Sequence, residues 1–171
     1  MNILTVICAR GGSKSVPKKN IKKLLGKPLI HYSISQARSY NKLHPTIIND
    51  IVVSTDNLEI ANIAVKYGAR VPFIRPSSLA TDSAGKISVL RHALSKMEKI
   101  ENKTYDMVID LDITAPIRTI QDIEECINLF MNKRTDVVFS VVKSRKNPYF
   151  NMVEIKDGFA RLCKLPQKLI L

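Results

Sequence analysis

A chain of 171 residues, of which 45% are hydrophobic, is long enough to form one globular domain with a real apolar core, without disulfides or metals. Its longest apolar runs are the size of strands and fall far short of the roughly 20 residues that cross a bilayer, so we expect no membrane span. The formal charge of +12 attracts anions, which leaves nucleic acid, a membrane surface or a phosphorylated small molecule as candidate partners.

Apolar runs without strict alternation predict strands that are buried on both faces. They cover residues 3–9, 51–54, 71–74, 107–111 and 137–142. Between them, apolar residues at three-and-four spacing predict helices over residues 30–39, 58–67, 87–100 and 120–132. Gly68 suits the end of the second helix, and Thr119 with Asp122 resembles a capping box at the start of the last. This alternation predicts an α/β fold with a Rossmann-like, doubly wound, mainly parallel sheet, which binds ligands at the carboxyl ends of its strands.

The pattern changes after residue 142. Residues 149–155 and 159–165 flank the tripeptide KDG at 156–158, which predicts an antiparallel hairpin within residues 145–165 instead of another crossover. The run at 168–171 is apolar and has no turn residue to close it. We therefore expect a single domain over residues 1–171 that is truncated at its C-terminus.

The three cysteines, Cys8, Cys126 and Cys163, are too few and too widely spaced for a disulfide framework or a zinc site. Each has apolar neighbours, so we interpret them as buried, reduced thiols. The first residues also lack the basic region and the small-residue cleavage site of a signal peptide. Together these features favour a cytoplasmic location.

The segment ARGGSKSVPKKN, residues 9–20, directly follows the first predicted strand. Its two glycines let the backbone approach a phosphate closely, and its N–H groups together with Arg10, Lys14 and Lys19 can neutralise a triphosphate. It is not a Walker A loop, because its first lysine follows a serine, and it lacks the third glycine of a dinucleotide-binding loop. On these residues alone, a structural turn with solvated charges stays an alternative.

Further motifs follow this loop along the chain. They are RGGSK (10–14), GKPLI (26–30), VSTD (53–56), GA (68–69), RP (75–76) leading to LATD (79–82), TAPIR (114–118) and FSV (139–141). In this order they resemble the acylneuraminate cytidylyltransferase family over nearly the whole chain. The resemblance implies an α/β nucleotidyltransferase domain with a dimerising hairpin. It also implies CTP and a nine-carbon sugar acid, such as sialic or legionaminic acid, as substrates, and Mg²⁺ as cofactor.

The resemblance also implies roles for individual residues. Those expected to bind the nucleotide are Arg10, Gly11, Gly12, Ser13, Lys14, Lys19, Asn20, Arg75, Ala80, Thr81, Asp82 and Lys86. Within this set the cations of the loop would bind the triphosphate, while Asn20, Arg75 and residues 79–82 would surround the cytosine and ribose. Arg75 precedes a proline, and a rigidly held guanidinium suits a base or a phosphate, although an ordinary surface cation is the alternative. The expected catalytic residues are Arg10, Lys19 and Asp112.

One motif departs from the family. Sialic-acid-specific members have LQPTSPLR where this chain has LDITAPIR at 111–118, so a glutamine near the reaction centre becomes Asp112. Asp110 and Asp112 share one face of a strand, and carboxylates suit Mg²⁺, so the pair is predicted to hold the metal against the triphosphate. Equally, Asp112 could select a different sugar, or one of the two could cap the strand end. The family's other metal-binding carboxylate pair has no match within the 171 residues.

In the expected reaction the anomeric hydroxyl of the sugar acid attacks the α-phosphate of CTP and pyrophosphate leaves, with cations offsetting the charge. His31, His44 and His92 show no metal-ligand spacing. One alternative is a guanylyltransferase of an amino-sugar phosphate, which would use the same loop and would favour the change to Asp112. Another is a basic RNA-binding module, but the cations crowd one loop and aromatic residues are only 6%. We expect a homodimer, and neither nucleic acid nor a membrane as partner.

Overall fold

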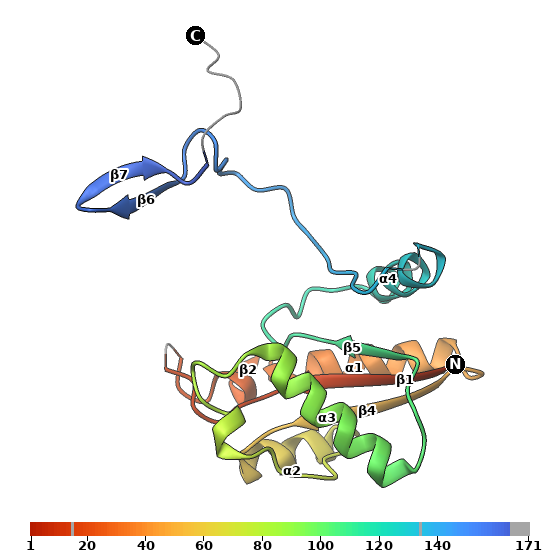
Figure 1. The fold of residues 1–171 in the computed structure, drawn as a ribbon. Coiled ribbons are helices and arrows are strands. Elements are labelled where there is room, and N and C mark those ends of the chain that lie inside the picture. The colour runs from red at the N-terminus through yellow and green to blue at the C-terminus, as the bar shows by residue number, and fades with distance from the viewer. Residues whose placement is uncertain (15, 134, 165–171) are drawn as a thin grey trace. The chain divides into compact units, whose positions relative to one another are not determined.

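The computed structural model describes residues 1–14, 16–133 and 135–164, and it divides at residue 127 into two units (Figure 1). The elements in chain order are β1 (Asn2–Cys8), the 3₁₀ helix η1 (Lys19–Ile21), β2 (Lys23–Leu24), β3 (Lys27–Pro28), α1 (Leu29–Leu43), β4 (Ile48–Ser54), α2 (Leu58–Lys66), the 3₁₀ helix η2 (Ser77–Leu79), α3 (Lys86–Glu101), β5 (Met107–Asp110), α4 (Ile120–Lys133), β6 (Val153–Lys156) and β7 (Phe159–Leu162).

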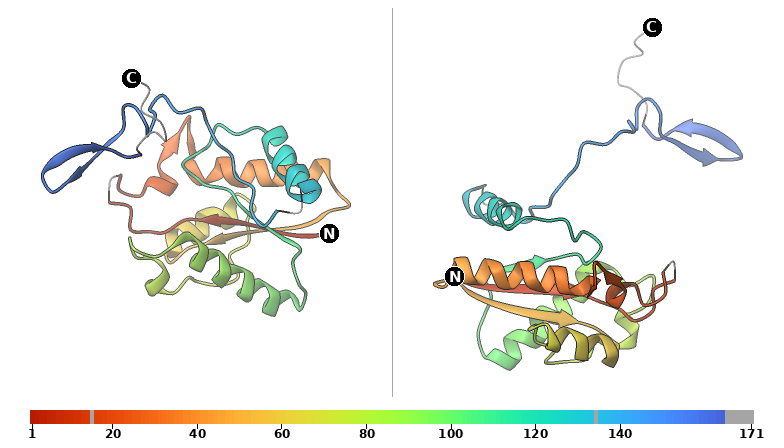
Figure 2. Two further views of the ribbon diagram at one scale, coloured as in Figure 1. Left: turned by 45° about the horizontal axis from the view of Figure 1, so that its top comes forward. Right: turned by 180° about the vertical axis from the view of Figure 1, so that it is seen from behind.

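The first unit is built on a parallel sheet with the strand order β4-β1-β5. Side chains alternate along β1, so Leu4 and Val6 face Ala93 and Met97 of α3 in a buried cluster. Helix α1 lies on the opposite face of the sheet from α3 and buries Ile30 among other residues (Figures 1 and 2). Helices on both faces of a parallel sheet confirm the predicted α/β fold.

All four predicted helices form, and the two predicted capping signals, at the end of α2 and the start of α4, are observed. The backbone N–H of Thr119 donates to Asp122 Oδ2 at 2.7 Å, and the N–H of Asp122 donates to Thr119 Oγ1 at 3.1 Å, which is the predicted capping box before α4. Gly68 follows α2 with a φ of 90°, a backbone conformation that residues other than glycine rarely adopt. The local signals in the sequence therefore fix these helices well.

The predicted strand at residues 71–74 is wrong. Only Arg70 bridges to Val52 of β4, and residues 71–74 that follow are neither strand nor helix. Pro72 has no N–H to donate to a neighbouring strand, so the chain cannot continue the ladder beyond this bridge.

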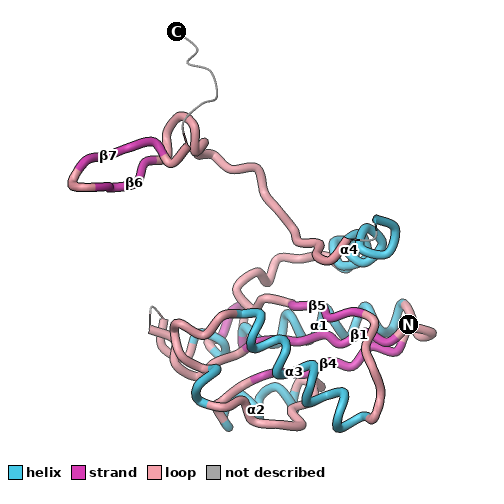
Figure 3. Tube along the Cα trace, in the orientation of Figure 1, coloured by secondary structure: helices cyan, strands magenta, loops and turns pink. Residues whose placement is uncertain are grey.

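The predicted strand at residues 137–142 is also wrong. Figure 3 shows these residues as loop, and Phe139, Val141 and Val142 are strongly exposed. An apolar run forms a strand only beside another strand, and within residues 128–133 and 135–164 of the second unit the sole ladder joins β6 to β7.

The predicted hairpin forms from β6 and β7. Val153 pairs with Leu162, and the turn consists of Asp157 and Gly158 with φ of 55° and 81°, as a tight two-residue turn requires. The strands are shorter than predicted. Residue 165 and the apolar run at 168–171 lie outside the described residues.

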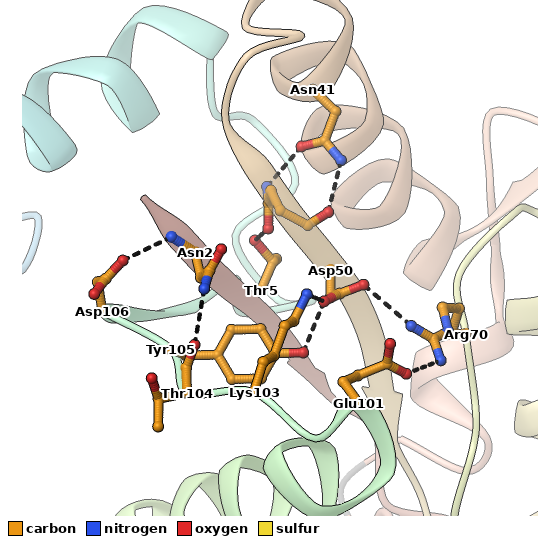
Figure 4. Close-up of polar contacts among 11 residues, drawn as sticks. Asn2, Thr5, Asn41, Asp50, Arg70, Glu101, Lys103, Thr104, Tyr105 and Asp106 are labelled. Carbon is orange, nitrogen blue, oxygen red and sulfur yellow. Dashed lines mark hydrogen bonds and ion pairs between the residues drawn. The ribbon is translucent and has the colours of Figure 1, made fainter.

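A polar network joins the amino ends of β4 and β5 (Figure 4). The carboxylate of Asp50 accepts hydrogen bonds from the Tyr105 hydroxyl at 2.7 Å and the Lys103 ammonium at 2.7 Å. Arg70 lies between Asp50, at 3.1 Å, and Glu101. The network therefore ties β4 to the end of α3 and to the segment before β5.

The three cysteines are free, as predicted, but their burial differs. Cys8 and Cys126 are partly buried, whereas Cys163, which directly follows the exposed strand β7, is exposed. Within the described residues, no helix is both long and apolar enough to cross a bilayer.

Candidate active site

A cavity of about 300 Å³ lies at the carboxyl ends of the strands, where the loops after β1, β4 and β5 meet. The predicted site residues that line it are Arg10, Ser13, Lys14, Lys19, Asn20, Arg75, Thr81, Asp82, Lys86 and Asp112. Four others, Gly11, Gly12, Ala80 and Asp110, do not line the cavity itself. The topology thus gathers residues from distant parts of the chain at the edge where parallel sheets bind ligands.

The loop after β1 is held by its neighbours at two points. The backbone N–H of Gly11 donates to Asp56 Oδ1 at 2.9 Å, and the buried amide of Asn20 donates to the Arg10 carbonyl at 2.9 Å. A Cβ at Gly11 would lie only 3.0 Å from the Cβ of Asn57, so a side chain there would press against Asn57. A Cβ at Gly12 would meet nothing within 4 Å. The protein's own packing therefore does not explain the second glycine.

Two cations of this loop share one carboxylate. Arg10 Nη2 lies 2.6 Å from Asp82 Oδ1, and Lys14 Nζ lies 2.5 Å from Asp82 Oδ2. Arg10 Nη1 also donates to the Thr81 carbonyl at 2.8 Å. The hydrogen bond from Lys14, with that from Arg10, lowers the pKa of Asp82. A carboxylate thus pairs with two cations that the sequence predicts to bind phosphate.

Two carboxylates at the end of β5 converge on one ammonium. Lys86 Nζ lies 2.9 Å from Asp110 Oδ2 and 3.5 Å from Asp112 Oδ2. The other oxygen of Asp112 accepts hydrogen bonds from the backbone N–H and the hydroxyl of Thr114, at 2.7 and 2.6 Å. One oxygen of each carboxylate therefore points to a single position that already holds a positive charge.

The environment separates the pKa values of these two carboxyl groups. Burial raises the pKa of Asp110, whose side chain is only 27% exposed. Burial alone would also raise the pKa of Asp112, but the hydrogen bonds from Thr114 together with the charge and hydrogen bond of Lys86 outweigh it and lower that pKa. Among the described residues no group of three or more His, Cys, Asp or Glu side chains could hold a metal. A divalent ion here would have two protein ligands, and such a ligand set fits Mg²⁺ bound together with substrate phosphates.

Arg75 is fixed in place mainly by backbone contacts. Its backbone N–H donates to the Thr55 carbonyl at 2.8 Å, and Nη2 of its guanidinium donates to the Ser54 carbonyl at 2.8 Å. The side chain is buried, and its Nε has no hydrogen-bond partner. Burial lowers the pKa of the guanidinium. Arg75 therefore joins the end of β4 to the cavity and keeps one donor unused.

Sequence reasoning missed the clamp that holds the loop with Asp112. Gln36 of α1 donates to the carbonyls of Pro116 and Arg118, both at 2.8 Å, and accepts a hydrogen bond from Arg118 Nη1 at 2.8 Å. Arg118 Nη2 in turn donates to the Asp112 carbonyl at 3.0 Å. Arg118 belongs to the TAPIR block and could have been suspected. Gln36 shows no signal, because a single amide on a helix is unremarkable in sequence.

Cys8 is another residue of the cavity that the sequence did not indicate as part of the site. It ends β1 and lines the cavity beside Lys86 and Val89. Burial, with the nearby carboxylate of Asp110, raises the pKa of its thiol to about 11. The thiol is therefore protonated at neutral pH, and it contributes a small wall instead of a nucleophile.

Comparison with known proteins gives one consistent result. Residues 4–157 match the protein family described as Cytidylyltransferase. The chain is 45% identical over 156 residues to post-translational flagellin modification protein B of Campylobacter coli. It is 43% identical over 156 residues to CMP-N,N'-diacetyllegionaminic acid synthase of Campylobacter jejuni. Each alignment covers 91% of this chain and 64% of the relative, so the chain spans less than two thirds of the length of these relatives.

Solved structures show the same fold at low identity. CMP:2-keto-3-deoxy-manno-octonic acid synthetase, in complex with CTP, superimposes with a TM-score of 0.63 at 20% identity, covering 78% of this chain and 49% of that one. 4-Diphosphocytidyl-2C-methyl-D-erythritol synthase from Anaerococcus prevotii gives 0.58 at 16% identity, covering 94% and 63%. At these identities the likeness concerns the fold alone.

Proposed function

We propose, because the chain belongs to the cytidylyltransferase family, that it binds CTP in the cavity at the carboxyl ends of the strands and transfers CMP to a nonulosonic acid. The sugar class rests on relatives named CMP-N,N'-diacetyllegionaminic acid synthase and pseudaminic acid cytidylyltransferase. The observation that carries the proposal is that the cations of the loop after β1 and the carboxylate of Asp112 line one cavity, and that Asp110 converges with Asp112 on the same ammonium.

The cations of the loop after β1 support binding of the triphosphate. Arg10, Lys14 and Lys19 line the cavity, and the exposed backbone at Gly12 leaves room for a phosphate to approach. Guanidinium and ammonium groups bind phosphate oxygens through charge-assisted hydrogen bonds, the stronger class of such bonds. Arg75, which is buried and also lines the cavity, supports recognition of the cytosine or ribose.

The carboxylates of Asp110 and Asp112 support a site for Mg²⁺. Their oxygens converge on one position, and the donor set suits an ion that keeps waters and binds phosphate oxygens as its other ligands. When bound, the metal would offset negative charge on the transferring phosphate. Thr114 would fix the orientation of the Asp112 carboxylate, because it already holds one of its oxygens.

In the proposed reaction the anomeric oxygen of the sugar acid bonds to the α-phosphorus of CTP. The bond from the α-phosphorus to the bridging oxygen breaks, pyrophosphate leaves with the electron pair, and the proton of the hydroxyl is released to solvent. Arg10 and Lys19 would stabilise charge on the phosphates, and the clamp of Gln36 and Arg118 would keep Asp112 at the cavity. Catalysis would therefore depend on charge and position, with no covalent intermediate on the protein.

A nucleotide panel tests the proposal directly. Isothermal titration calorimetry of the full chain with Mg²⁺ should give tighter binding for CTP than for GTP, UTP or a short RNA. CTP with Mg²⁺ should also raise the melting temperature, since a ligand that binds only the native state stabilises it. Preference for GTP would favour a guanylyltransferase, and equal binding of every polyanion would refute a base-specific site.

The proposed active form is a homodimer. The second unit exposes a run of large apolar side chains, including Phe139, Phe150 and Phe159, and exposed apolar patches mark surfaces that associate. Light scattering after size-exclusion chromatography should give twice the mass of the chain. A monomer at all concentrations would contradict this part of the proposal.

A further inference from the structure

The loop between η2 and α3 contributes the carboxylate of Asp82 to the cavity, and the first residue of α3 contributes the ammonium of Lys86. Asp82 pairs with Arg10 and Lys14, and Lys86 pairs with Asp110 and Asp112. Four charged groups proposed to bind phosphate or metal, Arg10, Lys14, Asp110 and Asp112, are thus already paired within the chain. Asp82 lies in the loop between η2 and α3, and Lys86, four residues later, is the first residue of α3.

We propose that Asp82 and Lys86 are internal competitors of the ligands, Asp82 standing in for a phosphate group and Lys86 for the divalent cation. This inference rests on the proposed function, and it names two residues that would set the affinity of the site for each part of a metal-bound nucleotide. Binding of a polyphosphate would displace the Asp82 carboxylate, and binding of a divalent ion would displace the Lys86 ammonium.

The contacts of Asp82 match those expected of a phosphate group. Each of its two oxygens faces a different cation, Arg10 at 2.6 Å and Lys14 at 2.5 Å. The Asp82 side chain is 44% exposed, and exposed ion pairs contribute little to stability, so a polyphosphate with more charge can replace it readily. Asp82 can leave without exposing any buried charge.

Lys86 is placed in the same way toward the metal site. Its ammonium lies where one oxygen of Asp110 and one of Asp112 converge. It is the first residue of α3, and its flexible stem can swing outward without breaking a hydrogen bond of the helix. A divalent ion brings twice the charge of the ammonium to the same two oxygens, and can therefore displace it.

A purely structural role for these pairs makes the opposite prediction. If the pairs only hold the loop in place, removing them should loosen the loop and weaken binding at the cavity. If they compete with ligands, removing them should tighten binding. The sign of the change therefore separates the two interpretations.

For the phosphate side, the probe is inorganic triphosphate titrated calorimetrically into the full chain in buffer with EDTA. Asp82→Asn should tighten binding about threefold to tenfold. The substitution removes the carboxylate that pairs with Arg10 and Lys14, so these two cations are free to bind the anion. The matched control is Glu59→Gln, which removes an exposed carboxylate paired to Lys18 at 2.8 Å outside the cavity. The control should bind triphosphate as the wild type does.

For the metal side, the probe is Mn²⁺ without nucleotide, with free Mn²⁺ counted by electron paramagnetic resonance. Lys86→Met should bind Mn²⁺ about tenfold more tightly, since a competing charge is lost from two carboxylates. Lys86→Gln, which keeps a polar side chain, should show the same gain if the fold is intact. Lys18→Met removes one positive charge elsewhere and should leave Mn²⁺ affinity unchanged.

The outcomes separate this inference from the proposed function. Unchanged or weaker binding in Asp82→Asn and in both Lys86 variants, with CTP still preferred by the wild type, overturns the competitor role alone. Equal gains in the control variants also overturn it, because the effect would then be one of net charge. If wild type and variants bind neither triphosphate nor CTP, both the inference and the proposed function fail.

Discussion

The two ends of the parallel sheet both carry charged clusters, but the clusters are built differently. At the amino end, Asp50 is 17% exposed and is surrounded by Arg70, Lys103 and Tyr105 (Figure 4). At the carboxyl end, the carboxylates that line the cavity are far more accessible, at 44% for Asp82 and 52% for Asp112. Similar residues thus form a closed network at one end and an open one at the other.

This difference in exposure indicates that the charged cluster at the amino end stabilises the fold, whereas the cluster at the carboxyl end is open to a ligand. Around Asp50, Arg70 comes from the segment after α2, and Lys103 and Tyr105 come from the segment before β5. Because Arg70 also pairs with Glu101, the network joins β4, the end of α3 and the segment before β5. Around the cavity, the partners face solvent, and a ligand can replace them. We therefore expect substitutions at the amino end to change folding, and those at the carboxyl end to change binding.

The largest expected effect is that of Asp50→Ala on stability. It leaves Lys103 without its counter-charge, leaves Arg70 with Glu101 alone, and removes the acceptor of the Tyr105 hydroxyl, which should cost about 2 to 4 kcal/mol in free energy of unfolding. Urea denaturation followed by circular dichroism measures it. Affinity for CTP, measured on the folded variant, should stay the same. A loss of CTP affinity with stability intact would break the division between the two ends.

Acid should gradually remove the contribution of the Asp50 carboxylate to the free energy of unfolding. Burial alone would raise the pKa of Asp50, but the hydrogen bonds from Lys103 and Tyr105 outweigh it, so the folded-state pKa lies below its ordinary value. A depressed carboxyl pKa gives stability that is present above the unfolded-state pKa and is lost as the pH falls through the folded-state pKa. The difference in unfolding free energy between wild type and Asp50→Asn should therefore shrink below about pH 4. A difference that persists at low pH would contradict an ionic role for Asp50.

At the carboxyl end, Arg10→Ala should act on binding. It removes a guanidinium that lines the cavity, and we expect CTP affinity to fall by about 1.5 to 3 kcal/mol, as for the loss of a charge-assisted hydrogen bond. Stability should change little, because the Arg10 side chain is 34% exposed and its ion pair with Asp82 lies at the surface. Calorimetry with CTP and urea denaturation provide the two readouts. An unchanged dissociation constant in the folded variant would remove Arg10 from the site.

Gln36→Ala tests a residue that supports the carboxyl end without lining the cavity. Its loss frees the loop at residues 112–118, and we expect a decrease of about 1 to 2 kcal/mol in stability together with weaker Mn²⁺ binding. Gln36→Glu keeps an acceptor for Arg118, so it should recover part of the lost stability and part of the lost Mn²⁺ affinity. Equal Mn²⁺ affinity in wild type and Gln36→Ala would show that the clamp does not position Asp112.

These contrasts also show which parts of the molecule the sequence could predict. Helices and their caps depend on nearby residues, so Thr119 and Asp122 were recognisable as a pair. The loop of Arg10 was predictable because its glycines and cations are contiguous. The prediction of a strand at residues 71–74 was wrong because it relied on the apolar pattern of this segment. Pro72 has no N–H to donate to a neighbouring strand, and this prevents the strand from continuing beyond the bridge at Arg70.

Contacts between distant segments were not predictable in the same way. The pairing of Asp82 with Arg10 and Lys14 depends on how two loops meet above the sheet. Sequence placed all three residues at the nucleotide but could not show that they neutralise one another. Likewise, nothing in the sequence near residue 36 indicates the loop that Gln36 holds.

The smallest expected change in stability comes from Gly12→Ala, which sharpens the comparison within one loop. A Cβ at Gly12 would meet no protein atom within 4 Å, so the free energy of unfolding should stay within about 0.5 kcal/mol of wild type. If a phosphate lies against this backbone, as we propose, the added methyl group would stand in its path and CTP binding should weaken. Gly11→Ala is the matched contrast, because its Cβ would lie 3.0 Å from the Cβ of Asn57 and should cost stability as well. Thermal melting and calorimetry on both variants separate the two effects. Unchanged CTP affinity in Gly12→Ala would mean that the phosphates approach the loop through the side chains of Arg10 and Lys14, and that the open space at Gly12 has no part in binding.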